Sequence, residues 1–282
     1  MKAKLLDGIV VASSIKSGLK KKVKELKMCG IDPCLSTILV GDDIGSATYV
    51  RNKHKAASEV GITALDYRCS NDIKEVELIE LINSLNNNDK VHGILVQLPL
   101  PHHINESNII ECIKPSKDVD GLTPYNSGRL LNGTPLLKPC TPTGIMEILN
   151  YYALDVSGLD AIVVNRSNLV GKPLTFLLLE RNATVTICHS QTKGLATKLR
   201  SADIVISAVG KRSKFVIDGS MIRDGSIIID VGVSRSEGRL LGDIDFDSVE
   251  DKAAWITPVP GGVGPMTIAM LLKNTVSAVS LT

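Results

Sequence analysis

Short apolar runs that end in turn residues alternate with helical patterns along this chain, and no other feature constrains its fold as strongly. In the first part, apolar runs predict strands near residues 37–40, 63–67 and 93–97. Helical periodicity fills the intervals, near residues 11–26, 47–60 and 75–85. Strands separated by helices form parallel sheets with helices on their faces, so the predicted class is α/β.

A second series of the same kind follows Pro142. Strands are expected near residues 161–164, 184–188, 204–207 and 227–230, and a helix near 169–181 joins the first two. This order is typical of a nucleotide-binding lobe. Between Pro99 and Pro142 the chain is rich in Pro, Asn, Gly and Asp and lacks steady periodicity. We therefore expect a crossing between two lobes there, with a cleft between the lobes.

Charge and targeting signals exclude several classes of function. The 282 residues carry a formal net charge of +2, which gives no strongly basic surface for nucleic acid. The first residues lack the apolar core of a signal peptide, and no apolar run is long enough to span a membrane. Six cysteines without a Cys-x-x-Cys spacing favour structural thiols in a reducing compartment. We expect a cytoplasmic protein that binds neither nucleic acid nor membrane.

One helix carries a group suited to proton chemistry. Ser46, Tyr49 and Lys53 are spaced i, i+3 and i+7, so they share one helix face. A lysine whose charge is disfavoured by burial can act as a base near neutral pH, and a neighbouring phenol can complete a proton relay. Taken alone, the spacing favours a solvated basic face, because His54 and Lys55 follow directly.

Polar residues also follow the third predicted strand. Gln97 ends that strand, at the edge where open α/β sheets bind ligands, although satisfying local backbone groups explains it equally well. In the string KDVDG at residues 117–121, one carboxylate could accept two adjacent N–H groups of a flat heterocycle such as a pterin. An Asx turn explains the same string, and spacing alone favours the turn.

The strand-to-helix turn that begins at Asn165 is of the kind that meets the phosphates of a dinucleotide. It contains Arg166 and lacks the common G-x-G-x-x-G pattern. Ser190 follows the next strand, where the ribose of a dinucleotide usually lies, and no acidic residue stands there. Arginine with serine suits a 2′-phosphate and therefore favours NADP over NAD. An ordinary surface turn with a solvated arginine is the alternative.

The string PVPGGVGP at residues 258–265 is too rich in Gly and Pro for a helix or strand, so a shaped loop is predicted. The helix that follows carries a stripe of Ile268, Leu271, Leu272, Thr275 and Val279. Such a stripe needs a partner surface to cover it.

Together these strings resemble the bifunctional methylenetetrahydrofolate dehydrogenase/cyclohydrolase family, the FolD enzymes, over essentially the whole chain. The matching strings are VGDD at 40–43, YVRNK at 49–53, GILVQLP at 93–99, KDVDG at 117–121, PCTP at 139–142, RS at 166–167, VGKP at 170–173 and residues 258–267. The resemblance implies oxidation of 5,10-methylenetetrahydrofolate with NADP, followed by hydrolysis of the methenyl product to 10-formyltetrahydrofolate. It also implies a homodimer whose substrates are tetrahydrofolate derivatives.

The resemblance further implies a folate-binding catalytic domain over residues 1–120, which the C-terminal helix at 266–282 rejoins. An NADP-binding domain of Rossmann type covers residues 141–265, and residues 121–140 form the crossing. Lys53 would be the cyclohydrolase lysine, with Tyr49 stacked on the folate and assisting. Gln97 would tune that lysine, and Asp120 would hold the pterin.

The resemblance also assigns residues to ligands, with no metal ion. The implied substrate-binding residues are Tyr49, Val50, Arg51, Asn52, Lys53, Val96, Gln97, Leu98, Asp120, Pro258, Pro260, Gly261 and Gly262. The implied cofactor-binding residues are Asn165, Arg166, Ser167, Ser190 and Val233. The loop over residues 258–266 would close over the folate.

The chain departs from the family pattern at Asn165, where Gly is usual, and at Ile44-Gly45, where Pro-Ala is usual. Asparagine tolerates positive φ better than most side chains, but its bulk limits the approach of a cofactor pyrophosphate. Two alternatives are a shikimate-dehydrogenase-like NADP oxidoreductase and a regulator that binds folate or a dinucleotide without catalysis. The string at 258–267 argues against the first, and the intact set of Lys53, Tyr49 and Gln97 argues against the second.

Overall fold

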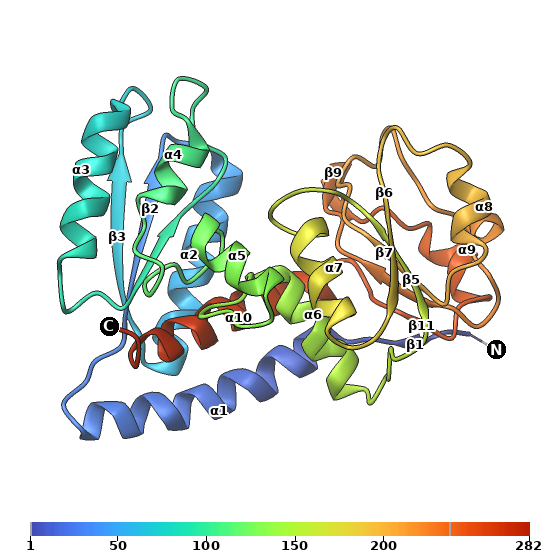
Figure 1. Cartoon of the computed structure of the whole chain (residues 1–282), viewed down its shortest axis with the longest axis horizontal. Coiled ribbons are helices and arrows are strands. Elements are labelled where there is room, and N and C mark those ends of the chain that lie inside the picture. Colours follow the sequence, from blue (N-terminus) through green and yellow to red (C-terminus); the bar gives the residue numbers. More distant parts are fainter. Residues whose placement is uncertain (1, 237) are drawn as a thin grey trace. The chain divides into compact units, whose positions relative to one another are not determined.

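The computed structural model describes residues 2–236 and 238–282. The chain divides into two compact units, each with its own parallel sheet (Figure 1). Unit 1 contains Met1–Ala12 and Thr141–Thr267, and unit 2 contains Ser13–Cys140 and Ile268–Thr282. Both units combine strands and helices, which confirms the α/β class.

Unit 2 is built on a three-stranded parallel sheet with the order β3-β2-β4. Its strands are β2 (Cys34–Val40), β3 (Thr63–Cys69) and β4 (Gly93–Val96). The helices α2 (Ile44–Val60) and α3 (Glu75–Asn86) connect them in chain order. The predicted βαβ series is therefore confirmed in this unit.

One face of this sheet is covered by α3, which lies beside β3 in Figure 1. Leu78, Ile82 and Leu85 recur at helical spacing on α3 and are fully or almost fully buried. They share a core with the alternate residues Ile38 and Val40 of β2. Burial of each such side chain stabilises the fold by about 1.5–3 kcal/mol. The packing between α3 and the sheet therefore fixes the strands whose carboxyl ends carry the candidate site.

The stretch between Pro99 and Pro142, for which no periodicity was found, contains two short helices. They are α4 (Glu106–Glu111) and α5 (Pro124–Leu131). Asn105 caps α4 and Thr123 caps α5, each through a side-chain oxygen that accepts a backbone N–H of the first turn. Helices of one or two turns show too few repeats to reveal a period, so only these caps could have indicated them.

Unit 1 contains a six-stranded parallel sheet with the order β1-β11-β8-β7-β5-β6. Its strands are β1 (Lys4–Leu5), β5 (Asp160–Val164), β6 (Thr184–Cys188), β7 (Ile204–Ser207), β8 (Ile227–Asp230) and β11 (Trp255–Ile256). The predicted strands at 184–188, 204–207 and 227–230 are confirmed to the residue. The edge strand β1 and its neighbour β11 have only two residues each, which is too short to show a pattern in the sequence.

Helices and a small second sheet complete unit 1. The helices are α6 (Cys140–Tyr151), α7 (Gly171–Leu179), α8 (Leu195–Leu199), α9 (Phe246–Glu250) and the 3-10 turn η1 (Gly219–Met221). The second sheet pairs β9 (Ser234–Ser236) with β10 (Arg239–Leu241). A core formed by β5, β7 and β8 with residues of α8 and α9 lies on one face of the large sheet.

The first residues of the chain join unit 1, because β1 pairs with β11 through Lys4 opposite Trp255. The domain predicted over residues 1–120 includes this segment. Three helices contribute residues to both units: α1 (Gly8–Met28), α10 (Val263–Ala278) and, through its first residue alone, α6. Of the predicted stripe on the last helix, Leu271, Leu272 and Thr275 are buried.

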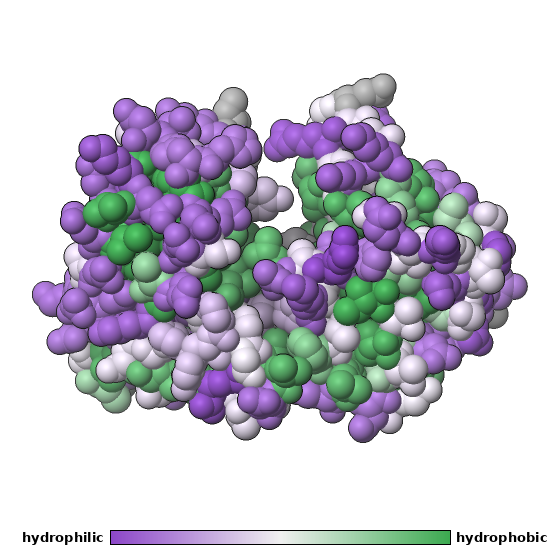
Figure 2. Space-filling model, turned by 45° about the horizontal axis from the view of Figure 1, so that its top comes forward, coloured by the Kyte–Doolittle hydropathy of each residue, from purple (hydrophilic) through white to green (hydrophobic). Residues whose placement is uncertain are grey.

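Among the described helices, none combines the length and the apolar character that a membrane crossing requires. On the face shown in Figure 2, hydrophilic side chains cover much of the surface and hydrophobic ones form smaller patches.

Candidate active site

Each sheet has a topological switch point, which is a strand whose two neighbours are reached by connections that run to opposite sides of it. In unit 2 this strand is β2, since β3 lies on one side of it and β4 on the other. In unit 1 it is β5, which lies between β6 and β7. Ligands of open α/β sheets bind at the carboxyl ends of strands at such switch points. Lys53 and Gln97 lie at the first of these places, and Asn165, Arg166, Ser167 and Ser190 lie at the second.

In unit 2, Lys53 and Gln97 meet at the carboxyl end of the sheet. Lys53 lies on α2, and its Nζ donates a hydrogen bond of 2.9 Å to Oε1 of Gln97. The amide of Gln97 in turn donates from Nε2 to the carbonyl oxygen of Leu98 at 2.7 Å. This second bond fixes which end of the amide faces the lysine, so Gln97 can only accept from Lys53.

In this site, burial and the attraction between Lys53 and Asp120 act in opposite directions on the pKa values of both side chains. Burial lowers the pKa of Lys53 below its ordinary value, while the nearby Asp120 carboxylate acts in the other direction. Burial raises the pKa of Asp120, and the neighbouring Asp118 adds to this, while Lys53 opposes it. Burial thus disfavours the charged form of both side chains. An uncharged amine that can accept a proton is therefore available nearer to neutral pH than for a solvated lysine.

The two carboxylates of the KDVDG string have different surroundings. Asp118 is buried and accepts hydrogen bonds from the backbone N–H groups of Leu122 and Thr123 and from Nδ2 of Asn126, at 2.8 to 3.1 Å. It is the turn-forming residue. Asp120 forms no part of that turn network and instead faces Lys53 and the thiol of Cys140. Of the two interpretations of this string, the turn therefore applies to Asp118, and the ligand contact remains open to Asp120.

Cys140 and Asn274 belong to this site and were missed as candidates. Burial and the adjacent carboxylate of Asp120 raise the pKa of the Cys140 thiol well above its ordinary value, so it remains a neutral donor. That thiol also lies 3.2 Å from the carbonyl oxygen of Val119. Asn274 of α10 donates to the carbonyl oxygens of Val119 and Lys138, both at 2.8 Å. Asn274 therefore fixes the backbone next to Asp120.

The remaining predicted residues of α2 point in different directions. Tyr49, one turn before Lys53, has half of its surface exposed. Val50 is 1% exposed and packs in the core, whereas Arg51 and Asn52 are exposed. Beside Gln97, Val96 is buried and Leu98 is partly buried.

The predicted loop residues Pro258, Pro260, Gly261 and Gly262 lie in unit 1. The loop is closed by a hydrogen bond of 2.8 Å from the Gly262 N–H to the Pro258 carbonyl oxygen. It also contacts the start of α1, where the Ile9 N–H donates to the Gly261 carbonyl oxygen at 3.1 Å. The sequence predicted a shaped loop over residues 258–265, and these bonds give its first part a defined shape. The prediction was wrong for the last three residues, because α10 already begins at Val263.

Unit 1 contains a cavity of about 590 Å³ at its switch point. Residues that follow three neighbouring strands line it. Asn165, Arg166 and Ser167 follow β5, His189 and Ser190 follow β6, and Val209, Lys211, Lys214 and Phe215 follow β7. Four of the five predicted cofactor residues therefore lie together. The fifth, Val233, is exposed and lies next to this wall, because a side chain at Gly210 would contact its backbone.

Asn165 is turned toward the protein backbone. Its Oδ1 accepts the N–H groups of Ser167 at 2.6 Å and of Gly171 at 3.2 Å, and its Nδ2 donates to the Ala208 carbonyl oxygen at 2.5 Å. It is not among the residues with positive φ, so it does not substitute for glycine in that way. Its side chain instead joins the turn after β5 to the segment after β7.

Lys211 and Lys214 were not identified from the sequence as cofactor residues. Both are exposed and line the same cavity as Arg166, so three basic side chains line it. The signal for them was weak, because the string GKRSKF at 210–215 looks like any basic surface loop. Only the sheet order, which places the carboxyl end of β7 next to β5, brings this loop to the cavity.

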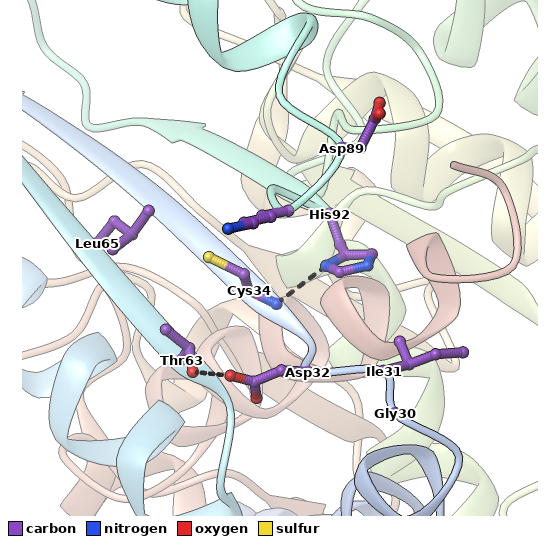
Figure 3. A pocket seen from close by; sticks show the side chains of 9 residues that line it. Gly30, Ile31, Asp32, Cys34, Thr63, Leu65, Asp89 and His92 are labelled. Carbon is purple, nitrogen blue, oxygen red and sulfur yellow. Dashed lines mark hydrogen bonds between the residues drawn. The ribbon is translucent and has the colours of Figure 1, made fainter.

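A further cavity of about 520 Å³ lies at the opposite, amino-terminal edge of the small sheet. Figure 3 shows two hydrogen bonds among the residues that line it: the Thr63 hydroxyl donates to Asp32 at 2.7 Å, and the Cys34 N–H donates to His92 at 3.2 Å. Because Gln97 follows β4 at the other end of this sheet, the cavity is separate from the site around Lys53.

Two domain models of one protein family match this chain. The catalytic-domain model of tetrahydrofolate dehydrogenase/cyclohydrolase matches residues 6–120, and the NAD(P)-binding-domain model of the same family matches residues 139–282. The Bifunctional protein FolD of Cenarchaeum symbiosum is 55% identical over 276 residues, covering 98% of both chains.

Two solved structures are similar over nearly the whole chain. The bifunctional enzyme FolD from Campylobacter jejuni has 48% identity and a TM-score of 0.96, covering 99% of both chains. FolD from Trypanosoma brucei, solved with NADP cofactor and an inhibitor, has 38% identity and a TM-score of 0.94, covering 100% of this chain and 98% of that one. Shikimate 5-dehydrogenase from Listeria monocytogenes, covering 89% of this chain and 92% of its own, reaches 12% identity and a TM-score of 0.52, which is a likeness of fold alone.

Proposed function

This chain belongs to the tetrahydrofolate dehydrogenase/cyclohydrolase family, and from that premise we propose how its own residues carry out the two activities. The first activity oxidises 5,10-methylenetetrahydrofolate to the 5,10-methenyl cation with NADP. The second hydrolyses this cation to 10-formyltetrahydrofolate. We assign the folate to the site around Lys53 in unit 2 and NADP to the cavity beside Arg166 in unit 1.

The hydrogen bond between Lys53 and Gln97 is the observation that carries the hydrolytic assignment. Water that attacks the methenyl carbon must lose a proton, and an uncharged lysine amine can accept it. Burial lowers the pKa of Lys53 and so increases the uncharged fraction. Gln97 orients the amine without supplying a charge that would favour the ammonium form.

Asp120 is suited to hold the pterin ring. It lies beside Lys53, and its carboxylate is not used by the turn that Asp118 forms. A carboxylate can accept two adjacent N–H groups of a flat heterocycle, and it stays in place because Asn274 fixes the neighbouring backbone. Tyr49, half exposed one turn before Lys53, offers a ring on which the folate can stack.

The cavity of unit 1 fits NADP by the chemistry of its donors. Arg166 and Ser190 lie on two walls and suit a 2′-phosphate, while Lys211 and Lys214 supply further positive charge. The N–H groups of Val170, Gly171 and Lys172 at the start of α7 are bonded to protein oxygens. Side-chain cations therefore carry much of the phosphate binding. When bound, NADP supplies the acceptor for the hydride that leaves the one-carbon bridge.

A steady-state assay tests the proposal. Purified protein with 5,10-methylenetetrahydrofolate and NADP should form the methenyl product, and methenyltetrahydrofolate alone should be hydrolysed faster than in buffer. Replacing NADP with NAD should lower the dehydrogenase kcat/KM while leaving the hydrolysis unchanged, because hydrolysis needs no dinucleotide. Absence of both activities in folded protein would leave binding without catalysis as the function.

We also propose that the protein is a cytoplasmic homodimer. The strand β6 supports this proposal, since it lies at one edge of the large sheet and pairs only with β5 among the described strands. Its side chains are mostly exposed, including Ile187, and an unprotected edge strand is a surface on which a second copy can pair. Light scattering coupled to size exclusion measures the mass in solution, and a single-chain mass at assay concentration would contradict the proposal.

A further inference from the structure

Unit 1 contains two buried carboxylates that the proposed reaction does not use. Asp230 ends β8 and is 4% exposed, and Asp243 follows β10 and is fully buried. Buried carboxylates are costly unless several donors bond to them. Both of these groups are bonded mainly to backbone N–H groups, and the residues that they hold lie close to the cofactor cavity.

Asp243 fixes the segment that follows β7. Its Oδ2 accepts the hydroxyl of Ser207 and the N–H of Val209, both at 2.7 Å. Its Oδ1 accepts the N–H of Gly210 at 2.9 Å. One carboxylate therefore holds three of the four residues from Ser207 to Gly210, in the segment that continues to Lys211.

Asp230 fixes Asp243 in turn. Its Oδ1 accepts the N–H groups of Gly232 and Asp243, both at 3.0 Å, and its Oδ2 accepts the N–H of Ile244 at 2.9 Å. The bond to Gly232 also sets the segment that leads to Val233. The two carboxylates thus form one strap between the segments after β7 and β8.

The backbone is shaped around these carboxylates. A Cβ atom on Gly232 would lie 2.2 Å from the carboxyl carbon of Asp243, and one on Gly242 would lie 1.8 Å from Oδ2 of Asp230. No side chain fits at such distances, so glycine is required at both positions for the carboxylates to reach the N–H groups.

Both strapped segments border the proposed cofactor site. Val209 lines the cavity that contains Arg166 and Ser190, and Lys211 follows two residues later. Gly210 lies against the backbone of Val233, so the two segments support each other. A shift of the segment after β7 would move one wall of the cavity.

We propose that Asp243, held by Asp230, is a positioning residue of the dehydrogenase that sets the cofactor-binding wall formed by residues 207–211. This inference rests on the proposed function, because it assumes that NADP binds in the cavity beside Arg166. The strap holds backbone common to any dinucleotide, so it affects NAD and NADP alike. It has no part in hydrolysis, whose residues lie in unit 2.

The charge state of Asp230 gives a readout beyond stability. Burial raises its pKa to about 6, with the adjacent Asp243 adding to the effect and the backbone N–H groups opposing it. Arg212, Asp245 and Asp247 line the same small cavity as Asp230. Arg212 donates to the carbonyl oxygens of Gly242 and Ile244 and lies 4.0 Å from Asp245.

Cofactor binding should accordingly weaken as the pH falls through about 6, because protonated Asp230 is a poorer acceptor for the N–H groups of the strap. The 2′-phosphate of NADP titrates near the same pH, so this dependence is measured with NAD, which lacks that group.

Calorimetry of NADP and NAD binding to Asp243→Asn, Ser207→Ala and Asp247→Asn tests the strap. Asp243→Asn should weaken both cofactors by about tenfold or more, as expected for charge-assisted hydrogen bonds. Ser207→Ala removes one donor to Asp243 and keeps its charge, so it should act in the same direction by a smaller factor. Asp247→Asn, an exposed carboxylate of the neighbouring cavity, should change nothing.

Hydrolysis of methenyltetrahydrofolate by the same variants is the internal control and should stay within about twofold of wild type. Unchanged cofactor binding in both Asp243→Asn and Ser207→Ala overturns the inference. Equal loss of hydrolysis and dehydrogenation, with a lowered melting temperature, also overturns it by showing a purely structural role. If the wild-type protein itself binds no NADP, the proposed function fails, which is distinguishable from failure of the strap alone.

Discussion

The Nζ of Lys53 donates to Oε1 of Gln97 across 2.9 Å, which joins the middle of α2 to the carboxyl end of β4. The two residues are 44 positions apart and come together because α2 follows the central strand β2, which has β4 as its neighbour. In the sequence, each had a plain structural explanation of its own. Their contact favours the catalytic interpretation of both.

Lys53→Met should abolish hydrolysis of methenyltetrahydrofolate and leave a substantial part of the dehydrogenase activity. Only the attack of water requires a group that accepts a proton, whereas hydride transfer depends on positioning. Stopped assays of each reaction on purified protein measure the two rates separately. Lys55→Met is the matched control, because Lys55 is exposed on the same helix. Wild-type hydrolysis by the Lys53 variant would remove Lys53 from the mechanism.

The pH dependence of hydrolysis should follow the lowered pKa of Lys53. The rate should rise with pH as the amine loses its proton, and the rise should occur below the range in which a solvated lysine titrates. The Asp120 carboxylate raises the pKa of Lys53, so Asp120→Asn should lower that pKa and move the rise to lower pH. A rise that stays in place or moves to higher pH in this variant, measured at saturating folate, would contradict the electrostatic coupling.

Asp120→Ala should weaken folate binding by about 1.5–3 kcal/mol, the range for hydrogen bonds to a charged group. Both activities should decrease together, because they share one folate site. Isothermal calorimetry with a tetrahydrofolate measures the affinity, and Asp89→Ala, exposed at the other edge of the small sheet, is the control. Unchanged affinity would leave Asp120 with a structural role beside Asp118.

Three strands of the large sheet could be predicted to the residue. β7 and β8 are apolar runs of four residues, and β6 alternates Thr with Val and Ile, so β-branched residues mark all three. The longer β2 begins at Cys34, three residues before the predicted start. The short elements were missed. β1 and β11 have two residues each, and they are strands only because β8 offers an edge to which β11 can pair. Such pairing is a property of the folded sheet and leaves no local pattern.

Side-chain roles were harder to predict than elements. The string at 117–121 allowed a turn or a ligand contact, and only the three donors around Asp118 show that the turn depends on that residue and not on Asp120. Asn165 is predicted to limit the approach of a pyrophosphate through its bulk, and this stays a prediction. Its bonds to Ser167, Gly171 and Ala208 could not be predicted, because they depend on the placement of β5 beside β7.

The preference for NADP should reside mainly in Arg166. A 2′-phosphate carries extra negative charge, and a planar guanidinium can bond two of its oxygens, whereas the plain ribose hydroxyl of NAD offers it little. Arg166→Ala should therefore lower kcat/KM for NADP much more than for NAD, shifting their ratio by roughly one to two orders of magnitude.

Two further variants serve as a comparison and a control for the Arg166 prediction. Lys214→Ala, in the segment after the neighbouring strand β7 that lines the same cavity, should act in the same direction by a smaller factor, since a flexible ammonium meets phosphate as a point charge. Arg181→Ala is the control, because Arg181 lies beyond the far end of α7 and bonds to Asn150. Equal damage to the use of both cofactors by Arg166→Ala would contradict the 2′-phosphate assignment. The arginine would then bind a group that NAD and NADP share, which is the pyrophosphate, and the preference would have to lie with Ser190 and the two lysines.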